Sequence, residues 1–212
     1  MRERFLRIYT AAIADILDAQ GLYEQTLPPS IRPLRPGTRL AGPAFTVSGR
    51  SARPDSYDSA LRKVLVMLGD VPAGCVAVYA CAQDTAAHLG ELSVTSLKAR
   101  GVTGCVLDGG CRDVRFILEE DFPVFCGHIT PEDSTWRWEL EATQVPITVG
   151  KVQIEPGDWV VGDDDGVVVV PQGLAEAVLA EAEGKAATES EIRAAVRAGA
   201  SPLEAYERYG TF

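Results

Sequence analysis

The sequence predicts a single α/β or α+β domain built from 212 residues. Two observations carry this prediction: short apolar strands alternate with helix-like segments in the middle of the chain, and closely spaced β segments follow them. A chain of this length buries a substantial core within one domain. Its composition is that of an ordinary globular protein, with 46% hydrophobic and 24% charged residues.

The first part of the chain supplies the alternating elements. Apolar spacing predicts a helix from Phe5 to Ala19, which Gly21 ends. A proline-punctuated loop over residues 28–43 then leads into a strand. The elements expected next are a strand over 44–48, a helix over 56–67, a strand over 76–80, a helix over 88–100 stopped by Gly101, a strand over 103–108, a short helix over 113–120 and a strand over 123–126.

The second part begins with β segments over 147–152, 159–163 and 166–170, separated by Gly, Pro and Asp turns. We expect them to be antiparallel, because their connections are too short for crossovers. A long helix over 174–197 and a short one over 202–209 follow. The long helix is rich in Ala and Glu with a thin apolar stripe, which is typical of a helix that is exposed or packed on a partner subunit. The expected domain spans 1–212, with about 172–212 as a C-terminal helical extension.

Charge and hydropathy disfavour several function classes. The net charge of −10 disfavours binding to nucleic acid or to an anionic membrane, because an acidic surface repels phosphate groups. A small anionic substrate stays compatible with it, since such a ligand responds to local charge. No apolar run reaches the ~18 residues of a membrane span, and the first residues lack the apolar core of a signal peptide.

The cysteines and histidines point to a protein of the reducing cytoplasm. The five cysteines form no C-x-x-C pair, and we interpret them as small hydrophobic residues. Cys111, which precedes Arg112, is the one candidate thiol nucleophile. With only His88 and His128 available, a His-rich zinc site is not expected.

The most informative segment is Asp108-Gly109-Gly110-Cys111-Arg112-Asp113, where a predicted strand gives way to a helix. Asp113 lies near a helix N-terminus, whose partial positive charge favours the ionised form. An ionised carboxylate is a hard oxygen ligand suited to Mg²⁺ or Mn²⁺. Arg112 can clamp a carboxylate with two hydrogen bonds. The plainer alternative is a helix-capping Asp beside a solvated Arg.

A second segment, Leu89-Gly90-Glu91-Leu92-Ser93, opens the preceding predicted helix. Helix N-termini present free N–H groups that bind carboxylates or phosphates, and Gly90 allows a ligand to approach the backbone. The intervening helix and strand return the chain to the same sheet edge, so we expect this segment to meet Arg112–Asp113 where α/β sheets bind ligands. The plainer alternative is an ordinary first-turn Glu91.

Two further acidic groups have plainer interpretations. The run Asp163-Asp164-Asp165-Gly166 lacks the spacing of an EF-hand, and a tight β-turn explains it better than a cation site does. Glu189 and Glu191 lie on the long C-terminal helix, where a solvated face with local ion pairs is the ordinary outcome.

Taken together, these segments resemble one family, which contains the regulator of RNase E activity A and the class II 4-hydroxy-4-methyl-2-oxoglutarate aldolases. The resemblance covers most of the chain. The matching segments are Ala41-Gly42-Pro43-Ala44-Phe45-Thr46-Val47, Leu89-Gly90-Glu91-Leu92, Arg100-Gly101-Val102-Thr103-Gly104, Asp108-Gly109-Gly110-Cys111-Arg112-Asp113, Phe122-Pro123-Val124-Phe125, Pro156-Gly157-Asp158 and residues 163–171.

The resemblance implies a compact α/β/β domain with a central, partly barrel-like mixed sheet and flanking helices. It also implies a homotrimer or a homohexamer with active sites between subunits. The aldolase members are lyases that depend on a divalent metal, Mg²⁺ or Mn²⁺. They cleave 4-hydroxy-2-oxo acids to pyruvate and also decarboxylate oxaloacetate.

Carried over residue by residue, the resemblance makes Asp113 the direct metal ligand. Arg112 would bind the 2-oxo group and stabilise the enolate. Glu91 would hold metal-bound water and assist proton transfer. The amides of Gly90, Glu91, Leu92 and Ser93 would hold the pyruvyl carboxylate. Glu189 of a neighbouring subunit, rather than Glu191, would complete the outer metal shell.

One position departs from the family pattern. Active aldolases often carry an acid three residues after the Asp of the Arg–Asp pair, whereas this chain has Phe116 there, after Arg115. The particular substrate is therefore left open.

The alternative function is a non-catalytic regulator that binds an RNase E-type ribonuclease through the acidic surface. Asp113 favours the enzyme, because the regulator that names the family tends to lack this residue. A methyltransferase, another label carried in the family, is disfavoured because no glycine-rich loop for S-adenosylmethionine follows an early strand.

Overall fold

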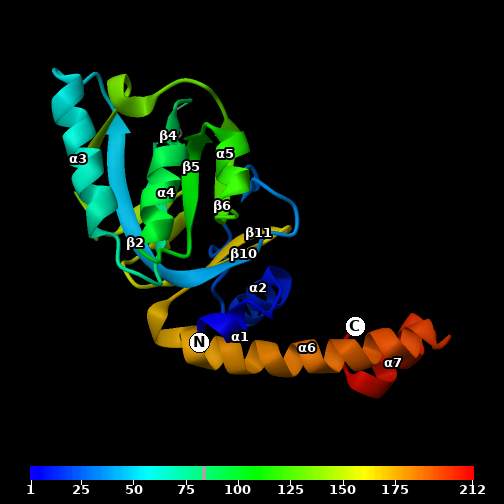
Figure 1. Ribbon diagram of the computed structural model, residues 1–212. Coiled ribbons are helices and arrows are strands. Elements are labelled where there is room, and N and C mark those ends of the chain that lie inside the picture. Colours follow the sequence, from blue (N-terminus) through cyan, green and yellow to red (C-terminus); the bar gives the residue numbers. More distant parts are fainter. Residues whose placement is uncertain (83–84) are drawn as a thin grey trace.

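One strongly curved mixed sheet organises the chain (Figure 1). The computed structural model describes residues 1–82 and 85–212. The strands are β1 (Arg32–Pro33), β2 (Leu40–Ser51), β3 (Val76–Ala80), β4 (Ala87–Leu89), β5 (Gly104–Cys111), β6 (Val124–Ile129), β7 (Trp138–Thr143), β8 (Ile147–Val149), β9 (Val152–Ile154), β10 (Trp159–Asp163) and β11 (Gly166–Val170).

Helices flank this sheet on two sides. They are α1 (Arg2–Phe5), α2 (Thr10–Ala19), α3 (Tyr57–Asp70), α4 (Glu91–Ala99), α5 (Val114–Glu119), α6 (Ala175–Arg197) and α7 (Pro202–Tyr209), with 3₁₀ turns at η1 (Ser134–Trp136) and η2 (Gln172–Leu174). None of the described helices is long and apolar enough to cross a membrane.

The strand order is β1-β6-β5-β3-β2-β10-β11, with β4 beside β5 and β7 beside β2, while β8 and β9 form a separate hairpin. The long strand β2 bends the sheet by changing partners. Its residues 40–43 pair with β10, residues 44–48 with β3, and residues 47–51 with β7. The sheet almost closes on itself, because Arg32 of β1 hydrogen-bonds the carbonyls of Asp164 and Asp165 next to β11. The predicted α/β class with a barrel-like sheet is confirmed.

Parallel pairing in the centre of the sheet fixes where functional residues meet. Strands β2, β3, β5 and β6 run in the same direction, and β4 is parallel to β5. Each connection passes through a helix, as parallel neighbours require. The segments that follow β4 and β5 therefore emerge at one edge of the sheet.

Three hydrophobic cores stabilise the layers. The first lies between the sheet and α3, α4 and α5 and includes Leu97, Leu107 and Ile117. The second fills the inside of the curved sheet around Val106 and Phe125. The third lies where α1, α2 and the start of α6 pack on β10 and β11 (Figure 1).

The predicted helix over 5–19 is wrong as a single element, because α1 ends at Phe5 and α2 begins at Thr10. The reason is a tertiary cap. The backbone N–H of Thr10 donates to Asp163 Oδ2 at 2.8 Å, and its hydroxyl donates to Asp163 Oδ1 at 2.7 Å. These bonds satisfy a free N–H at the start of α2.

Several other expectations need correction. The strand predicted over 103–108 continues to Cys111 as β5, and the loop predicted over 28–43 contains β1 and the start of β2. The helix predicted over 88–100 begins only at Glu91, because residues 87–89 pair with β5 as β4. The strand predicted over 147–152 is the β8–β9 hairpin, which turns at Gly150 with φ of 62°. Strand β7 had no sequence prediction, and it pairs with the outer end of β2. Gly101, with φ of 78°, ends α4 as expected.

The C-terminal helices form an arm. The first turns of α6 bury Val178, Leu179 and Ala182 against α2 and β11. Farther along, α6 projects beyond the rest of the molecule, and α7 folds back at its end (Figure 1). Ser201 and Glu204 form a capping box that begins α7. Both predicted C-terminal helices are confirmed.

Candidate active site

The structure brings the two predicted segments together at one sheet edge. Strand β4 ends at Leu89 and β5 at Cys111, and these two residues are paired. The next residue after β5, Arg112, donates its backbone N–H to the Leu89 carbonyl at 2.9 Å. The first turn of α4 and the Arg112–Asp113 pair are therefore neighbours, as the βαβ connection predicted.

Asp113 has an unusual backbone conformation and one uncommitted oxygen. It is the N-cap residue of α5 with φ of 58° and ψ of 33°, a left-handed conformation that Asp tolerates better than most residues. Its Oδ2 accepts a hydrogen bond from the backbone N–H of Glu91 at 3.1 Å. Among the described residues, no hydrogen bond or ion pair reaches Oδ1. The carboxylate is 45% exposed, so this oxygen can bind a ligand.

Gly90 permits this contact by lacking a side chain. Its backbone is extended, so conformational freedom is not the reason for glycine here. A Cβ at position 90 would lie 2.6 Å from Asp113 Oδ2 and 3.4 Å from Arg112 Cγ. The first of these distances is shorter than van der Waals contact, so a larger residue would push α4 and Asp113 apart.

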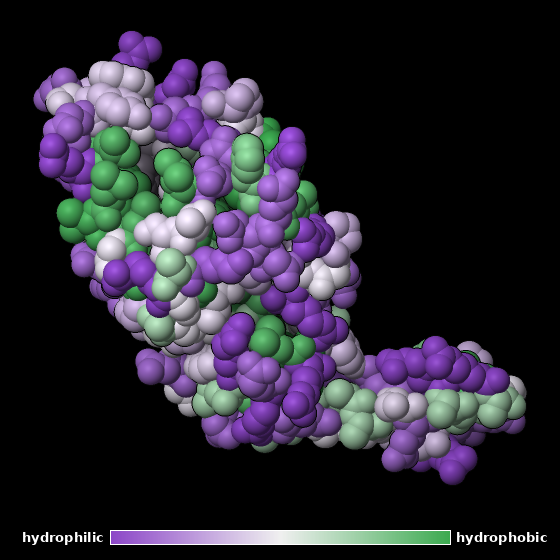
Figure 2. All heavy atoms as spheres, in the orientation of Figure 1, coloured by the Kyte–Doolittle hydropathy of each residue, from purple (hydrophilic) through white to green (hydrophobic). Residues whose placement is uncertain are grey.

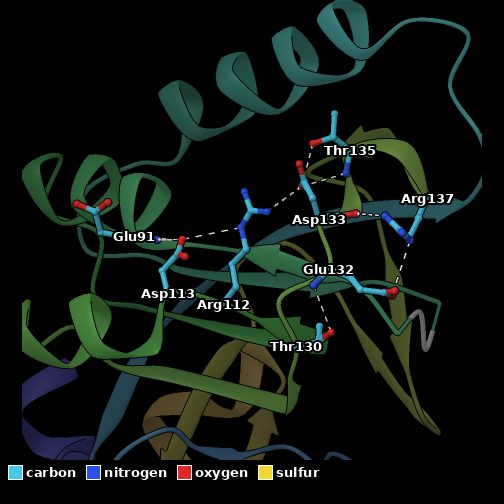
Figure 3. A network of polar contacts seen from close by, with 8 residues as sticks. All are labelled: Glu91, Arg112, Asp113, Thr130, Glu132, Asp133, Thr135 and Arg137. Carbon is cyan, nitrogen blue, oxygen red and sulfur yellow. Dashed lines mark hydrogen bonds and ion pairs between the residues drawn. The ribbon is translucent and has the colours of Figure 1, made fainter.

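Arg112 lies between two carboxylates (Figure 3). Its Nε is 3.8 Å from Asp113 Oδ2, and its Nη1 is 3.8 Å from Asp133 Oδ1. Both separations are ion pairs too long to be hydrogen bonds. The guanidinium is therefore oriented by charge while its N–H groups stay available, and the Arg112 side chain is 38% exposed.

Asp133 is a site residue that the sequence did not reveal. Its Oδ1 accepts hydrogen bonds from the backbone N–H of Thr135 at 3.2 Å and from the Thr135 hydroxyl at 3.0 Å. Its carbonyl accepts from Arg137 Nη1 at 3.0 Å, and Arg137 Nε lies 3.7 Å from Glu132 (Figure 3). In the sequence, Asp133-Ser134-Thr135 is a helix-capping pattern, but no neighbouring residue indicates that Asp133 lies beside Arg112.

A cavity of about 140 Å³ lies beside these groups, between α3 and the ends of β4 and β5. One wall is polar and the other is apolar. The polar wall includes Gly90, Ser93, Arg112, Asp113, Asp133 and Thr135, while the apolar wall includes Tyr57, Leu61, Val64, Met67 and Trp138. The cavity is thus suited to a small ligand with one charged end.

Two acids expected near the site are placed differently. Glu91 contributes its backbone N–H, but its carboxylate points away from Asp113 and Arg112 (Figure 3). Glu189 lies on the arm and accepts a hydrogen bond from the Tyr9 hydroxyl. Within one chain, α6 lies on the opposite side of the molecule from the sheet edge where β4 and β5 end (Figure 1). Glu191, also on the arm, is exposed.

The donor set decides what kind of cation the site fits. Across residues 1–82 and 85–212, no three His, Cys, Asp or Glu side chains converge to form a closed metal cage. Mg²⁺ typically keeps several waters and is held by one or two carboxylates together with substrate oxygens. A single acid with an open oxygen, Asp113, fits that mode of binding beside a chelating substrate.

The candidate thiol and the acidic turn have structural roles. Cys111 is buried, and its Sγ lies 3.5 Å from Cys126 Sγ. This hydrogen bond, together with burial, raises the pKa of the Cys111 thiol, which opposes a nucleophilic thiolate. Residues 163–166 form the predicted tight hairpin turn between β10 and β11.

The fold and the site define an α/β protein in which an acid with an open oxygen lies beside an arginine at the edge of a cavity. A family model described as "RraA-like: Aldolase/RraA" matches residues 10–169, and the chain belongs to this family. A similar protein from Halalkalibacterium halodurans, named "Putative 4-hydroxy-4-methyl-2-oxoglutarate aldolase", is 34% identical over 203 residues. That match covers 96% of this chain and 91% of the relative.

Two solved structures are also similar. An uncharacterised protein from Pseudomonas syringae pv. tomato has a TM-score of 0.83 at 31% identity, covering 96% of this chain and 94% of that one. Streptomyces coelicolor RraAS2, described as an unusual member of the RNase ES inhibitor RraA protein family, has a TM-score of 0.81 at 31% identity. That match covers 90% of this chain and 95% of the other.

Proposed function

We propose that the protein is a divalent-metal-dependent lyase that cleaves 4-hydroxy-2-oxo acids, of the 4-hydroxy-4-methyl-2-oxoglutarate type, to pyruvate and decarboxylates oxaloacetate. The observation that carries this proposal is the open oxygen of Asp113 beside Arg112, at the N-terminus of α4. The names of the aldolase relatives agree with it.

The pyruvyl carboxylate would bind at the first turn of α4. The backbone N–H groups of this first turn have no carbonyl partner within the helix, so they favour binding of an anion. The Glu91 N–H is given to Asp113, so the Gly90, Leu92 and Ser93 amides are the remaining donors. One of the four amides first expected is therefore already in use.

Asp113 would hold Mg²⁺ or Mn²⁺ through Oδ1. When bound, such an ion supplies positive charge to the 2-oxo acid group of the substrate. Arg112 supplies the second positive charge, because its N–H groups face the same cavity and are not consumed by close hydrogen bonds.

The reaction breaks the bond between C3 and C4. Its electron pair moves into the pyruvyl fragment and places negative charge on the 2-oxo oxygen, where Arg112 is positioned to stabilise it. The 4-hydroxyl loses its proton as the carbonyl product forms, and C3 is then protonated to give pyruvate. Oxaloacetate follows the same course with CO₂ as the leaving fragment. No lysine is among the described residues that line the cavity, so a Schiff base is not proposed.

Two acids would assist. Glu91 has its backbone at the site, and rotation of its side chain would bring the carboxylate to the cavity for proton transfer. Glu189 is proposed as an outer ligand only in a homo-oligomer, a trimer or hexamer, in which the arm of a neighbouring subunit reaches the site. That arrangement would require Glu189 to leave Tyr9.

The test is pyruvate release from oxaloacetate and from 4-hydroxy-4-methyl-2-oxoglutarate, measured with Mg²⁺ and with a chelator. We expect release well above the rate with Mg²⁺ alone, and loss of that release with chelator. Rates that never exceed the background of the free metal would contradict the proposal. Asp113→Asn, which keeps the shape of the side chain, is the matched inactive control.

A second candidate function is a regulator that binds an RNase E-type ribonuclease. The similarity to RraAS2 and the net charge of −10 favour it. A pull-down with such a ribonuclease tests it, and Asp113→Ala separates the two functions. The substitution should abolish lyase activity and leave protein binding almost unchanged.

A further inference from the structure

The cavity beside Arg112 has a second feature, which bears on the part of the substrate that is not pyruvate. Helix α3 covers the cavity with Tyr57, Leu61 and Val64, three residues spaced so that they share one helix face. Trp138 of β7, which is only 4% exposed, closes the same wall. A group bound against this wall would contact mainly carbon; the polar exception is the buried indole N–H of Trp138, which has no hydrogen-bond partner among the described residues.

The apolar character continues to the surface. Figure 2 shows apolar side chains gathered along α3 and toward α4. Leu92, in the first turn of α4, is 78% exposed and also lines the cavity. Tyr57 packs on Trp136 with ring centroids 5.5 Å apart, which places a second aromatic ring at the rim.

The charges of the cavity point the same way. Among the described residues that line it, Arg112 is the only Lys or Arg side chain. It already faces the carboxylates of Asp113 and Asp133, each at 3.8 Å. Asp133 is held in that position by Thr135, so it cannot easily turn away. A substrate with one carboxylate can pair with Arg112 and the α4 amides, but a second carboxylate would meet Asp133 and the apolar wall.

We infer that the enzyme prefers 4-hydroxy-2-oxo acids whose C4 substituent is uncharged and apolar, a short alkyl group or a phenyl ring, over those with a second carboxylate. The inference rests on the proposed lyase function and ranks its substrates: 4-hydroxy-4-methyl-2-oxoglutarate, the dicarboxylate in the relatives' names, would be cleaved more slowly than a compound with an apolar C4 substituent. Burying a carboxylate without a partner is unfavourable, and leaving a polar group unpaired in a site discriminates strongly between substrates.

The experiment compares two substrates that differ in one group. These are 4-hydroxy-2-oxopentanoate, with a methyl at C4, and 4-hydroxy-2-oxoglutarate, with a carboxylate there. The phenyl analogue, 4-hydroxy-2-oxo-4-phenylbutanoate, is the third. We expect kcat/KM for the methyl and phenyl compounds to exceed that for the dicarboxylate by about 10-fold or more. Equal values, or a preference for the dicarboxylate, would overturn the inference.

A second measurement separates this inference from the proposed function. Exchange of the methyl protons of pyruvate for deuterium, followed by NMR with Mg²⁺ in D₂O, needs only the pyruvyl end of the site. Exchange together with a preference for the dicarboxylate would overturn the inference alone. Absence of both exchange and cleavage would overturn the lyase proposal, and the inference with it.

Two variants test the apolar wall and the carboxylate separately. Leu61→Arg places a cation in the wall and should shift the ratio of the two kcat/KM values at least ~10-fold toward the dicarboxylate. Val66→Arg, on the exposed side of the same helix, is its control and should shift nothing. Asp133→Asn keeps the acceptor for Thr135 but removes the charge, and it should shift the ratio in the same direction by ~3-fold or more. If the ratio of the two kcat/KM values is unchanged in both Leu61→Arg and Asp133→Asn, the inference is overturned. If Leu61→Arg does not fold, the result for Asp133→Asn alone decides.

Discussion

Two acidic segments at strand ends differ in how the protein uses their carboxylate oxygens. Asp113 follows β5 and keeps one carboxylate oxygen without a partner among the described residues. Asp163 ends β10 in a run of three acids, and both of its oxygens are consumed. Its Oδ1 accepts from the Thr10 hydroxyl and from the Asp165 backbone N–H, at 2.7 and 3.0 Å, and its Oδ2 accepts from the Thr10 N–H at 2.8 Å.

The number of acids in a segment therefore says little about whether one of them has an oxygen free for a ligand. The three-acid turn has the higher density of negative charge, yet Asp163 caps α2 and Asp164 accepts from the Gly37 N–H at 2.7 Å. The exposed fraction separates Asp163 from Asp113 as well: Asp163 is 9% exposed as a residue, whereas the Asp113 side chain is 45% exposed. An acid whose oxygens are already bound by the protein stabilises the fold, and an acid with a free oxygen is available for chemistry.

The largest expected effect is that of Asp113→Asn. Asn tolerates the left-handed backbone and keeps the shape of the side chain, so the fold should remain while the charge is lost. We expect kcat for pyruvate release to fall by ~10³-fold, the upper end for removing one preorganised stabilising group. Steady-state kinetics checks this, with circular dichroism as the control for folding. Activity near that of the wild type would show that Asp113 is only a cap.

Gly90→Ala tests whether the close approach of α4 matters. The added Cβ would meet Asp113 Oδ2 at 2.6 Å and displace it, and we expect kcat/KM to fall by about 10- to 100-fold. Gly184→Ala is the matched control, because nothing lies within 4 Å of its added Cβ. It lies within α6, where Ala should stabilise the helix by up to ~1 kcal/mol. If both variants were equally active, the packing of α4 on Asp113 would have no functional role.

Asp163→Ala should act on stability and leave the chemistry intact. It removes the acceptors of the Thr10 N–H and hydroxyl, both buried, and we expect the free energy of unfolding to fall by about 1–3 kcal/mol. Urea denaturation measures this. Asp165→Ala, whose side chain is exposed and whose backbone N–H is retained, is the control with little effect. A loss of activity per folded molecule in Asp163→Ala would argue against a purely structural turn.

The smallest effect is expected at Asp108, a half-buried acid on β5. Burial raises the pKa of its carboxyl above the ordinary value. Between the ordinary and the raised pKa, the folded protein holds a proton that the unfolded chain releases, so stability falls as pH rises through that window. Asp108→Asn should remove this slope and stabilise the protein slightly at neutral pH. Urea unfolding curves recorded from acid to neutral pH measure this slope. A free energy of unfolding that falls more steeply with pH in Asp108→Asn than in the wild type would contradict the prediction.

Local patterns were enough to predict much of the fold. The bounds of β3, β10, β11 and α7 agree with the prediction, because apolar runs and turn residues define them without help from distant parts of the chain. The break between α1 and α2 could not be predicted in this way. It depends on Asp163, which lies 153 residues after Thr10.

The part of the candidate site that depends on local patterns could be predicted from the sequence. The part that depends on contacts between distant residues could not. A βαβ connection returns the chain to one sheet edge, so Gly90 and Arg112 could be placed together from sequence spacing alone. Asp133 arrives by a loop after β6, and the direction of the Glu91 carboxylate depends on its side-chain rotamer. Neither has a local signal that indicates contact with Arg112.

We propose that Asp113, and not the acidic turn, binds the cation. Titration of Mn²⁺ followed by electron paramagnetic resonance, with oxalate present as a mimic of the pyruvate enolate, tests it most directly. We expect one bound Mn²⁺ per chain in the wild type and in Asp165→Ala, and loss of that binding in Asp113→Asn. Binding that survives Asp113→Asn and disappears in Asp165→Ala would contradict it.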